Sequence, residues 1–342
     1  MNDYQNTALH QVHQIAQTKS AEQKLYLAKI CEPFHICSDQ LIGQILSNSV
    51  TINFHIDRLS AGGKTVIENL IEQGIYHNQF ITGTSNGALG GKRLEWEQRM
   101  FPGAYSEKEI ERPKYGALNI FQFLDGACVR FGSCFFTLKP HMIKYCTFSY
   151  GDSSVNPSTL CTIDTLEGIL SDLFKDVIQN SRMLNQAVSS QQEALAILMH
   201  HSNELKILGR NLDFCIEAHI HHTILLQDDV ASFYVDESYR DTEFEPQVQA
   251  LCQKYNIHLN WIPQRKISVH EIGNLFRGPK VPVLAKKIDI LFGNKQGIIN
   301  AYLIGKASRD SCIHPENWND IGDKSEMFQL IKQLWHTVGY FG

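Results

Sequence analysis

The sequence has no excess of positive charge, no paired cysteine motif and no long apolar run. Lys and Arg total 31 against 36 Asp and Glu, so the net charge of -5 provides no broad cationic field for a nucleic-acid backbone. The nine cysteines are scattered without CxxC pairs, which fits a reduced compartment better than a disulfide framework. No window approaches the roughly 18 uncharged apolar residues of a membrane span. We therefore expect neither a nucleic-acid nor a membrane partner.

Several short motifs are absent as well. The sequence contains no GxxxxGK[ST] phosphate loop and no GxGxxG after a strand, which excludes two familiar glycine-rich nucleotide motifs. It has no HExxH and no Cys/His spacing typical of a closed zinc site, so we expect no metal. The polar start, MNDYQNTALHQ, lacks the basic end and apolar core of a signal peptide. We expect a protein that is cytoplasmic, or that is secreted without a classical signal peptide.

Apolar residues nevertheless form 43% of the chain, which is enough to build a folded core. Their spacing predicts an α+β fold in three parts. Residues 1–48 carry apolar positions at helical intervals and form an N-terminal helical segment. Residues 49–264 alternate strands, helices and turns rich in Gly and aromatic residues, and form the expected core. Residues 265–342 form a C-terminal α/β extension, which contains the connector GPKVP and ends in a closing helix.

An acidic residue stands near the start of an apolar strand in the middle of the chain. In FCIEAHIHHTILL, Ile216, Ala218 and Ile220 alternate with Glu217 and His219, as in a strand with two unlike faces. A carboxylate in a half-buried cleft can stabilise positive charge that develops only in a transition state. The alternative is an exposed strand glutamate without a function, because glutamate is seldom buried unpaired.

A second polar group ends the predicted strand in TINFHIDR. Arg58 offers a planar guanidinium suited to phosphate oxygens, and His55 can donate or accept a proton near neutral pH. Side chains at the ends of strands commonly face binding crevices. The alternative is a surface ion pair between Asp57 and Arg58, with His55 at the edge of the core.

Two glycine-containing segments complete the candidates. In QFITGTSNGALGGKR, the small and hydroxyl side chains around Thr84, Ser85 and Asn86 let a ligand approach the backbone closely, although such residues also form ordinary turns. In RPKYGALN, Tyr115 either presents a ring face to a planar heterocycle or is a buried core residue.

The histidines near residue 220 invite a metal-site interpretation. His219 and His221 share one strand face and lie near Asp229 in sequence, which is the basis for a metal hydrolase as an alternative. The alternation weakens this interpretation, because His222 points to the opposite face.

A series of segments resembles a known family. In chain order they are FHIDR, QFITGTSNG, GGKRLEWE, FPGAY, RPKYGALN, RFGSCFF, TFSYGDS and EAHIHHTILLQDDV. Over residues 50–240 they resemble a bacterial family, the domain of unknown function 3626. That family is distantly similar to the ADP-ribosyltransferase superfamily. The resemblance implies a split β-sandwich core and NAD as co-substrate.

The resemblance also implies roles for individual residues. The superfamily has a His or Arg that ends the first core strand, a Ser/Thr/Tyr element beside the nicotinamide ribose, and a Glu that opens a later strand. By this resemblance Glu217 is the catalytic residue, and the NAD-binding residues are His55, Arg58, Thr84, Ser85, Asn86 and Tyr115. The middle element stays open between Thr84-Ser85 and Tyr115-Gly116. Cys215 stands where arginine-modifying members have a second Glu, which leaves the acceptor residue open.

The function implied is a mono-ADP-ribosyltransferase that modifies a side chain of a target protein, with arginine the favoured acceptor. Such an activity suits a bacterial effector that acts inside a host cell. Breaking the bond to nicotinamide builds positive charge at the anomeric carbon, as in glycoside hydrolysis, and the leaving group needs no strong acid. One carboxylate therefore suffices. The alternatives are an NAD glycohydrolase of the same fold and a non-catalytic scaffold that binds a nucleotide or a partner.

Overall fold

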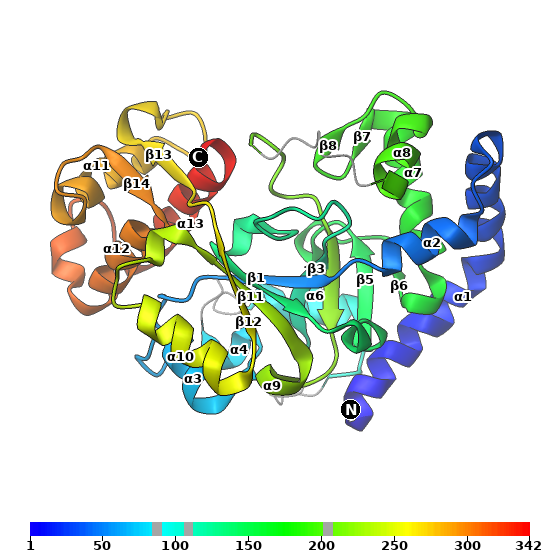
Figure 1. Ribbon diagram of the computed structural model, residues 1–342, viewed down its shortest axis with the longest axis horizontal. Coiled ribbons are helices and arrows are strands. Elements are labelled where there is room, and N and C mark those ends of the chain that lie inside the picture. Colours follow the sequence, from blue (N-terminus) through cyan, green and yellow to red (C-terminus); the bar gives the residue numbers. More distant parts are fainter. Residues whose placement is uncertain (84–90, 106–111, 201–207) are drawn as a thin grey trace.

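The computed structural model consists of helices arranged around one large β-sheet (Figure 1). It describes residues 1–83, 91–105, 112–200 and 208–342. Within these ranges the α-helices are α1 (Asp3–Cys31), α2 (Ser38–Leu46), α3 (Val66–Gln73), α4 (Gln79–Thr82), α6 (Lys92–Met100), α7 (Glu167–Asn180), α8 (Gln191–His200), α9 (Leu226–Asp229), α10 (Glu245–Tyr255), α11 (Lys280–Phe292), α12 (Ala301–Ile313) and α13 (Lys324–Phe341). Two short 3₁₀ turns that matter below are η3 (Val129–Phe131) and η7 (Glu237–Tyr239).

The large sheet has eight strands in the order β12-β11-β4-β1-β3-β9-β5-β6. In chain order the strands of the described residues are β1 (Val50–Phe54), β2 (Ile75–Tyr76), β3 (Lys114–Leu118), β4 (Cys134–Leu138), β5 (Cys146–Tyr150), β6 (Leu160–Cys161), β7 (Arg182–Met183), β8 (Gln186–Ala187), β9 (Ile216–Ile220), β10 (Ile224–Leu225), β11 (Val230–Asp236), β12 (His258–Ile262), β13 (Lys266–Ser268) and β14 (Ile298–Asn300). β11 and β12 are parallel, and the other neighbours in the sheet are antiparallel. The predicted mixture of helices and strands is confirmed.

The sheet separates into two halves between β1 and β3. These strands pair only at Val50 and Thr51 of β1. β1 stays paired with β4 as far as Phe54, and β3 stays paired with β9 as far as Lys114. In Figure 1, β1 and β5 accordingly run in different directions. The ends of β1 and β3 beyond Thr51 are therefore free to face other parts of the chain.

The loop between β3 and β4 forms hydrogen bonds with the part of β1 that does not pair with β3. The Asn53 side-chain amide donates a hydrogen bond to the Asp125 carbonyl at 2.9 Å, and the Cys128 N–H donates to Asn53 Oδ1 at 3.3 Å. A Cβ atom at Gly132 would lie 2.0 Å from the backbone of β1, so only glycine allows this approach. The loop consequently lies directly on β1, and it carries Arg130 of η3.

Side chains alternate between an apolar and a polar face of the sheet. The buried residues of the apolar face include Ile52, Phe54, Phe136, Phe148, Ile216, Ala218 and Ile220. The polar face includes Thr51, Asn53, Tyr115, Thr147, Glu217 and His219. The predicted alternation around Glu217 is confirmed. The predicted strand to residue 226 is wrong in length, because β9 ends at Ile220 and the next short strand, β10, pairs with β2 instead.

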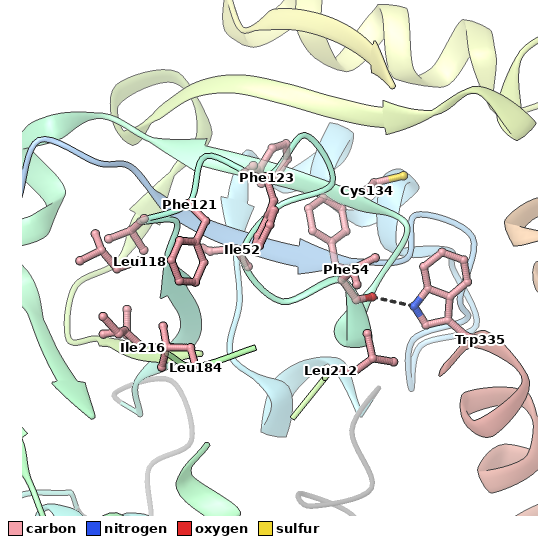
Figure 2. Packing of buried hydrophobic residues seen from close by; sticks show 14 of the residues in the cluster. Ile52, Phe54, Leu118, Phe121, Phe123, Cys134, Leu184, Leu212, Ile216 and Trp335 are labelled. Atoms are coloured by element: carbon pink, nitrogen blue, oxygen red, sulfur yellow. Dashed lines mark hydrogen bonds between the residues drawn. The ribbon is translucent and has the colours of Figure 1, made fainter. Parts of the chain in front are cut away.

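One hydrophobic cluster runs through the whole chain, from α1 to α13. Figure 2 shows part of it, in which Ile52 of β1 lies near Leu118, Phe121 and Phe123. In the same view the Trp335 indole N–H donates to a backbone oxygen, the carbonyl of Val129, at 2.8 Å. The predicted closing helix is therefore α13, packed against η3. The division of the chain at residues 48 and 264 stays a prediction, since all three parts share this core.

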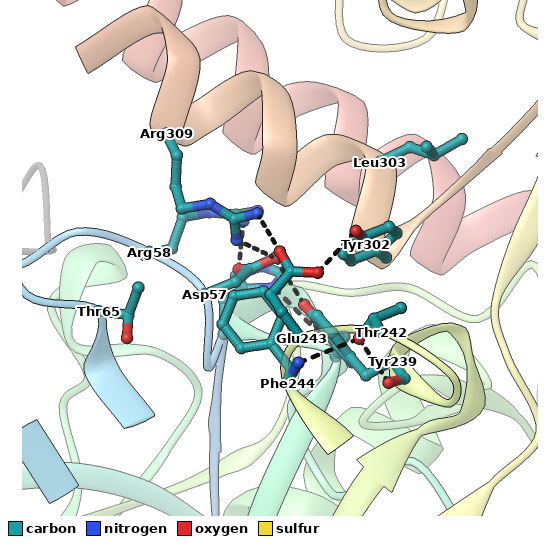
Figure 3. A network of polar contacts seen from close by, with 12 residues as sticks. Asp57, Arg58, Thr65, Tyr239, Thr242, Glu243, Phe244, Tyr302, Leu303 and Arg309 are labelled. Carbon is teal, nitrogen blue, oxygen red and sulfur yellow. Dashed lines mark hydrogen bonds and ion pairs between the residues drawn. The ribbon is translucent and has the colours of Figure 1, made fainter. Parts of the chain in front are cut away.

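The turn after β1 is attached to α12 by a buried carboxylate (Figure 3). Asp57 accepts hydrogen bonds from Arg58 at 2.6 Å and from the Tyr239 hydroxyl at 2.9 Å, and the Arg309 guanidinium lies 4.0 Å away. A Cβ atom at Gly305 of α12 would lie 1.4 Å from an oxygen of Asp57. The missing side chain therefore allows α12 to pack directly on the turn.

We predict that Gly305→Ala destabilises the protein. The added methyl group overlaps the buried Asp57 carboxylate, and such overpacking costs about 1–3 kcal/mol of unfolding free energy, measured by urea denaturation. The control is Gly43→Ala on α2, where a Cβ atom meets nothing within 4 Å. That helix-interior change should stabilise by roughly 0.5–1 kcal/mol. Equal stability of Gly305→Ala and wild type would contradict the close approach of α12.

Candidate functional site

A cavity of about 250 Å³ lies beyond the C-terminal end of β1. Its wall is assembled from segments far apart in the sequence: His55 and Arg58 after β1, Arg93 and Trp96 of α6, Arg130 of η3, Asp152, and Lys332 and Trp335 of α13. Tertiary packing alone brings these segments together. The separation of β1 from β3 and the loop that carries η3 set the positions of several of them.

Cations dominate the charged part of the wall. Arg58, Arg93, Arg130 and Lys332 line the cavity, and Asp152 is the acid among the described lining residues. Burial and then the charge of Arg130 lower the pKa of Lys332 from its ordinary value. Cations held this close in a partly buried site repel one another, so an anion between them relieves the repulsion. The wall therefore suits a ligand with negative charge.

Several buried polar atoms near the cavity have no hydrogen-bond partner in the protein. Within the described part of the chain, Arg93 Nε, Arg130 Nε and both ring nitrogens of His336 are buried and lack a hydrogen-bond partner. Buried polar atoms are nearly always hydrogen-bonded in folded proteins. The two arginines line the cavity, so their Nε–H groups indicate a bound group that accepts hydrogen bonds.

The structure places His55 and Arg58 on the cavity wall, as their position at the end of β1 predicts. The His55 ring lies edge-on to Trp335 at 4.9 Å between centroids, and its Nδ1 is 3.2 Å from the Ser133 hydroxyl. Burial, followed by the charge of Arg58, lowers the pKa of His55 well below its ordinary value. The alternative of a surface pair is wrong, because the Asp57 partner of Arg58 is fully buried.

Glu217 lies immediately behind the wall rather than in it. On the polar face of the sheet it occupies the same cross-strand row as Thr51, two strands away from β1. The residue is 3% exposed, so it is no exposed strand glutamate. One carboxylate oxygen is 3.0 Å from His219 Nε2, and the other accepts the Ser153 N–H at 3.1 Å. Both β1 and β9 thus direct polar groups toward the region of the cavity.

Arg93 connects Glu217 to the cavity. Its guanidinium donates to the Ser153 hydroxyl at 2.9 Å and lies over the rings of Tyr115 and Trp96, at 4.1 and 4.9 Å from their centroids. Burial by itself lowers the pKa of Arg93. The nearby Tyr115 and Glu217 raise this pKa by more than burial lowers it. Arg93 is therefore a firmly charged group between the carboxylate and the ligand space.

The remaining sequence candidates are placed differently. The Tyr115 hydroxyl donates to Glu97 at 2.9 Å, and one face of the ring is covered by Arg93, so Tyr115 supports the wall from behind. The candidates Thr84, Ser85 and Asn86 lie outside the described residues.

The metal alternative finds no assembled ligand set. His219 and His221 both contact the Thr147 hydroxyl, at 3.0 and 2.9 Å, whereas Asp229 is 2.9 Å from His141. Across residues 1–83, 91–105, 112–200 and 208–342, no group of three or more His, Cys, Asp or Glu residues is placed to hold a metal ion.

Sequence reasoning did not single out most of the cations of the wall. Arg93 stands in GGKRLEWE, and its position in a segment that resembles the family was the available signal. Arg130 stands in RFGSCFF and Asp152 in TFSYGDS, so the same signal was available for both. Lys332 lies between core residues of the closing helix, where the apolar spacing gives no hint that one lysine faces a cavity.

The chain belongs to the DUF3626 family, described as a protein of unknown function, whose family model matches residues 49–341. This confirms the resemblance to that one family and extends it almost to the C-terminus, so the family unit includes α13 with Lys332 and Trp335. A search of curated proteins found no match. In the described part of the chain, no helix combines the length and the apolar character that a membrane crossing requires.

We predict that buried histidines make the protein acid-sensitive. Burial, followed by the charges of Arg277 and Arg130, lowers the pKa of His336 to about 2, while an unfolded histidine has a pKa of about 6.5. Below pH 6.5 the unfolded chain therefore binds the extra proton. The stability from neutral His336 is complete above about pH 6.5 and falls by roughly 1.4 kcal/mol per pH unit on acidification.

His336→Phe should reduce the slope of unfolding free energy against pH by about one proton between pH 6.5 and 4.5, measured by urea denaturation. The control is His10→Phe on α1, an exposed position, which should leave the slope unchanged. An unchanged slope in His336→Phe would mean that this histidine takes up its proton over the same pH range in the folded protein as in the unfolded chain.

Proposed function

We propose that this protein is an NAD-dependent mono-ADP-ribosyltransferase. It takes NAD as co-substrate, releases nicotinamide and transfers ADP-ribose to a side chain of a target protein. The observation that carries the proposal is a cationic cavity wall with a buried carboxylate, Glu217, directly behind it. The first feature suits the diphosphate of NAD, and the second suits the positive charge that develops when the bond to nicotinamide breaks.

The wall offers what a diphosphate needs. Arg130 and Lys332 supply charge from η3 and α13, and the unpaired Nε–H groups of Arg93 and Arg130 supply directed donors. Guanidinium groups bind phosphate oxygens with two parallel hydrogen bonds, which also fixes orientation. The volume of about 250 Å³ is just below the roughly 300–1,000 Å³ typical of ligand pockets, so one part of the dinucleotide occupies the cavity and the rest extends outward.

Glu217 is the carboxylate for the bond-breaking step. Each of its oxygens is held by one donor, from His219 and from Ser153, which fixes the position of the carboxylate behind the wall. In the proposed complex the diphosphate competes for Arg93. The charge of Glu217 is then less compensated and stabilises the oxocarbenium-like centre, which is electrostatic stabilisation of the transition state.

The sheet supports the finer expectation of an ADP-ribosyltransferase-like split β-sandwich. In such a fold two sheet halves separate to admit NAD. β1 and β3 part after Thr51, which leaves His55 on one half and Glu217 on the other. Their positions fit the first and third elements of the superfamily pattern. The middle element stays open, since Tyr115 lies behind the wall and Thr84-Ser85 are outside the described residues.

An NAD glycohydrolase, with water as acceptor, is a second candidate that the charges favour. Arg93, Arg130 and Lys332 repel an approaching arginine side chain, whereas water meets no such barrier. Radiolabelled NAD distinguishes the two activities. A transferase leaves ADP-ribose on a protein from a candidate target mixture, while a glycohydrolase releases equal amounts of nicotinamide and free ADP-ribose.

We predict that Glu217→Gln reduces nicotinamide release by about 10²-fold or more at saturating NAD, because the charge that stabilises the transition state is lost. The matched control is Glu167→Gln, since Glu167 is also buried but contacts Ser20 on α1, away from the cavity. The control should stay within about threefold of wild type. An active Glu217→Gln variant would remove this carboxylate from the mechanism.

We predict that Lys332→Ala weakens NAD binding by about 10-fold, measured by calorimetry, because one phosphate partner is lost; the loss should shrink at high salt. Lys29→Ala on the exposed side of α1 is the control and should bind normally. A wild-type protein that binds NAD without releasing nicotinamide would support the non-catalytic scaffold. Absence of any NAD-induced thermal shift would contradict NAD as the ligand.

A further inference from the structure

A continuous line of hydrogen bonds leads to Glu217 across the buried polar face of the sheet. The Tyr105 hydroxyl contacts Nδ1 of His221, and Nε2 of His221 is 2.9 Å from the Thr147 hydroxyl. The same hydroxyl is 3.0 Å from Nδ1 of His219, whose Nε2 is 3.0 Å from Glu217. We refer to Tyr105, His221, Thr147 and His219 as the buried chain.

If Glu217 is ionised and both imidazoles are neutral, every bond has a defined direction. An ionised Glu217 only accepts, so His219 carries its proton on Nε2 and donates it. Nδ1 of His219 then accepts from the Thr147 O–H. The Thr147 oxygen in turn accepts from Nε2–H of His221, and Nδ1 of His221 accepts from the Tyr105 O–H. All four donors then point toward the carboxylate.

Both rings are enclosed by other side chains. Thr147, His219 and His221 are completely buried. Burial, followed by the nearby His219 and Lys114, lowers the pKa of His221 well below its ordinary value. Phe101 lies edge-on to both imidazoles, at 5.4 Å from the centroid of His219 and 4.8 Å from that of His221. Aligned hydrogen bonds in such a dry region polarise and strengthen one another.

We propose that the buried chain positions Glu217, holding its carboxylate in one orientation behind the cavity wall. Thr147 is the central positioning residue, because its single hydroxyl joins the two histidines. The chain continues on the other side of Glu217 through Ser153, whose N–H contacts the carboxylate and whose hydroxyl accepts from Arg93 on the cavity wall. This inference rests on the proposed function, in which Glu217 acts on NAD.

The test compares three variants that differ in one methyl or hydroxyl group. Thr147→Val removes the hydroxyl and keeps the shape, so it breaks both central bonds. Thr147→Ser restores the hydroxyl. Thr165→Val is the matched control, because Thr165 is also completely buried, and its hydroxyl accepts the Thr162 N–H at 3.0 Å, outside the buried chain and away from the cavity.

In steady-state NAD cleavage, Thr147→Val should lower kcat by about 10-fold or more while KM changes less than about threefold, since the ligand contacts remain. Thr147→Ser should recover kcat to within about threefold of wild type. Thr165→Val should lose a comparable amount of thermal stability but keep kcat. If Thr147→Val and Thr165→Val had the same kcat, or if Thr147→Ser failed to recover activity, Thr147 would be only structural.

The arrangement of protons is tested separately from activity by ¹⁵N-edited NMR of the imidazole groups in the wild-type protein. His219 and His221 should both appear as neutral rings with the proton on Nε2, and Thr147→Val should shift both sets of resonances. A charged ring, or a proton on Nδ1 of His219, would overturn the buried chain. A wild type that does not cleave NAD would instead refute the proposed function and the positioning role with it, while the spectra would still report on the chain.

Discussion

The separation of β1 from β3 after Thr51 is the constraint on which the site depends. Gly116 of β3 allows the two strands to approach closely where they separate, because a Cβ atom there would lie 2.6 Å from the Thr51 carbonyl oxygen. Because β3 does not pair with this part of β1, Asn53 forms hydrogen bonds with the loop between β3 and β4 instead. These bonds position Arg130, which lies in the same loop. Had the two strands stayed paired, neighbouring strands only about 4.8 Å apart would leave no room for a cavity beside His55.

The cationic wall is tolerable because neighbouring protein groups stabilise its three arginines. Arg58 is paired with buried Asp57 and Arg130 with Asp213. Arg93 has no such pair within the ion-pair distances of the described residues, and lies instead against two aromatic faces with Glu217 nearby. A guanidinium stacked in this way keeps its in-plane N–H groups available, so it is oriented for an acceptor before any ligand arrives.

The sequence predicts those parts of the site that depend on the pattern of neighbouring residues. Alternation marks β9 and the position of Glu217, and the end of an apolar strand marks His55 and Arg58. The burial of Asp57 is not readable, because it depends on the absence of a side chain at Gly305, far along the chain. The role of α13 is hidden for a similar reason: its apolar spacing predicts a core helix and says nothing of the lysine beside it. The pattern of neighbouring residues also does not predict the length of β9, because the pairing of β10 with β2 decides where β9 ends.

A single segment, residues 92–105, connects the cavity with the buried polar face. Its first part, α6, contributes Arg93 and Trp96 to the wall, and its last part contributes Phe101 and Tyr105 to the packing around the two histidines. Apolar side chains in place of the buried chain would give a more stable protein, because each buried polar group must first lose its bound water. The buried chain is therefore best explained by the residue to which it leads. Since the same segment closes the cavity and excludes water from the chain, a displacement of α6 alters the ligand contacts and the environment of Glu217 together.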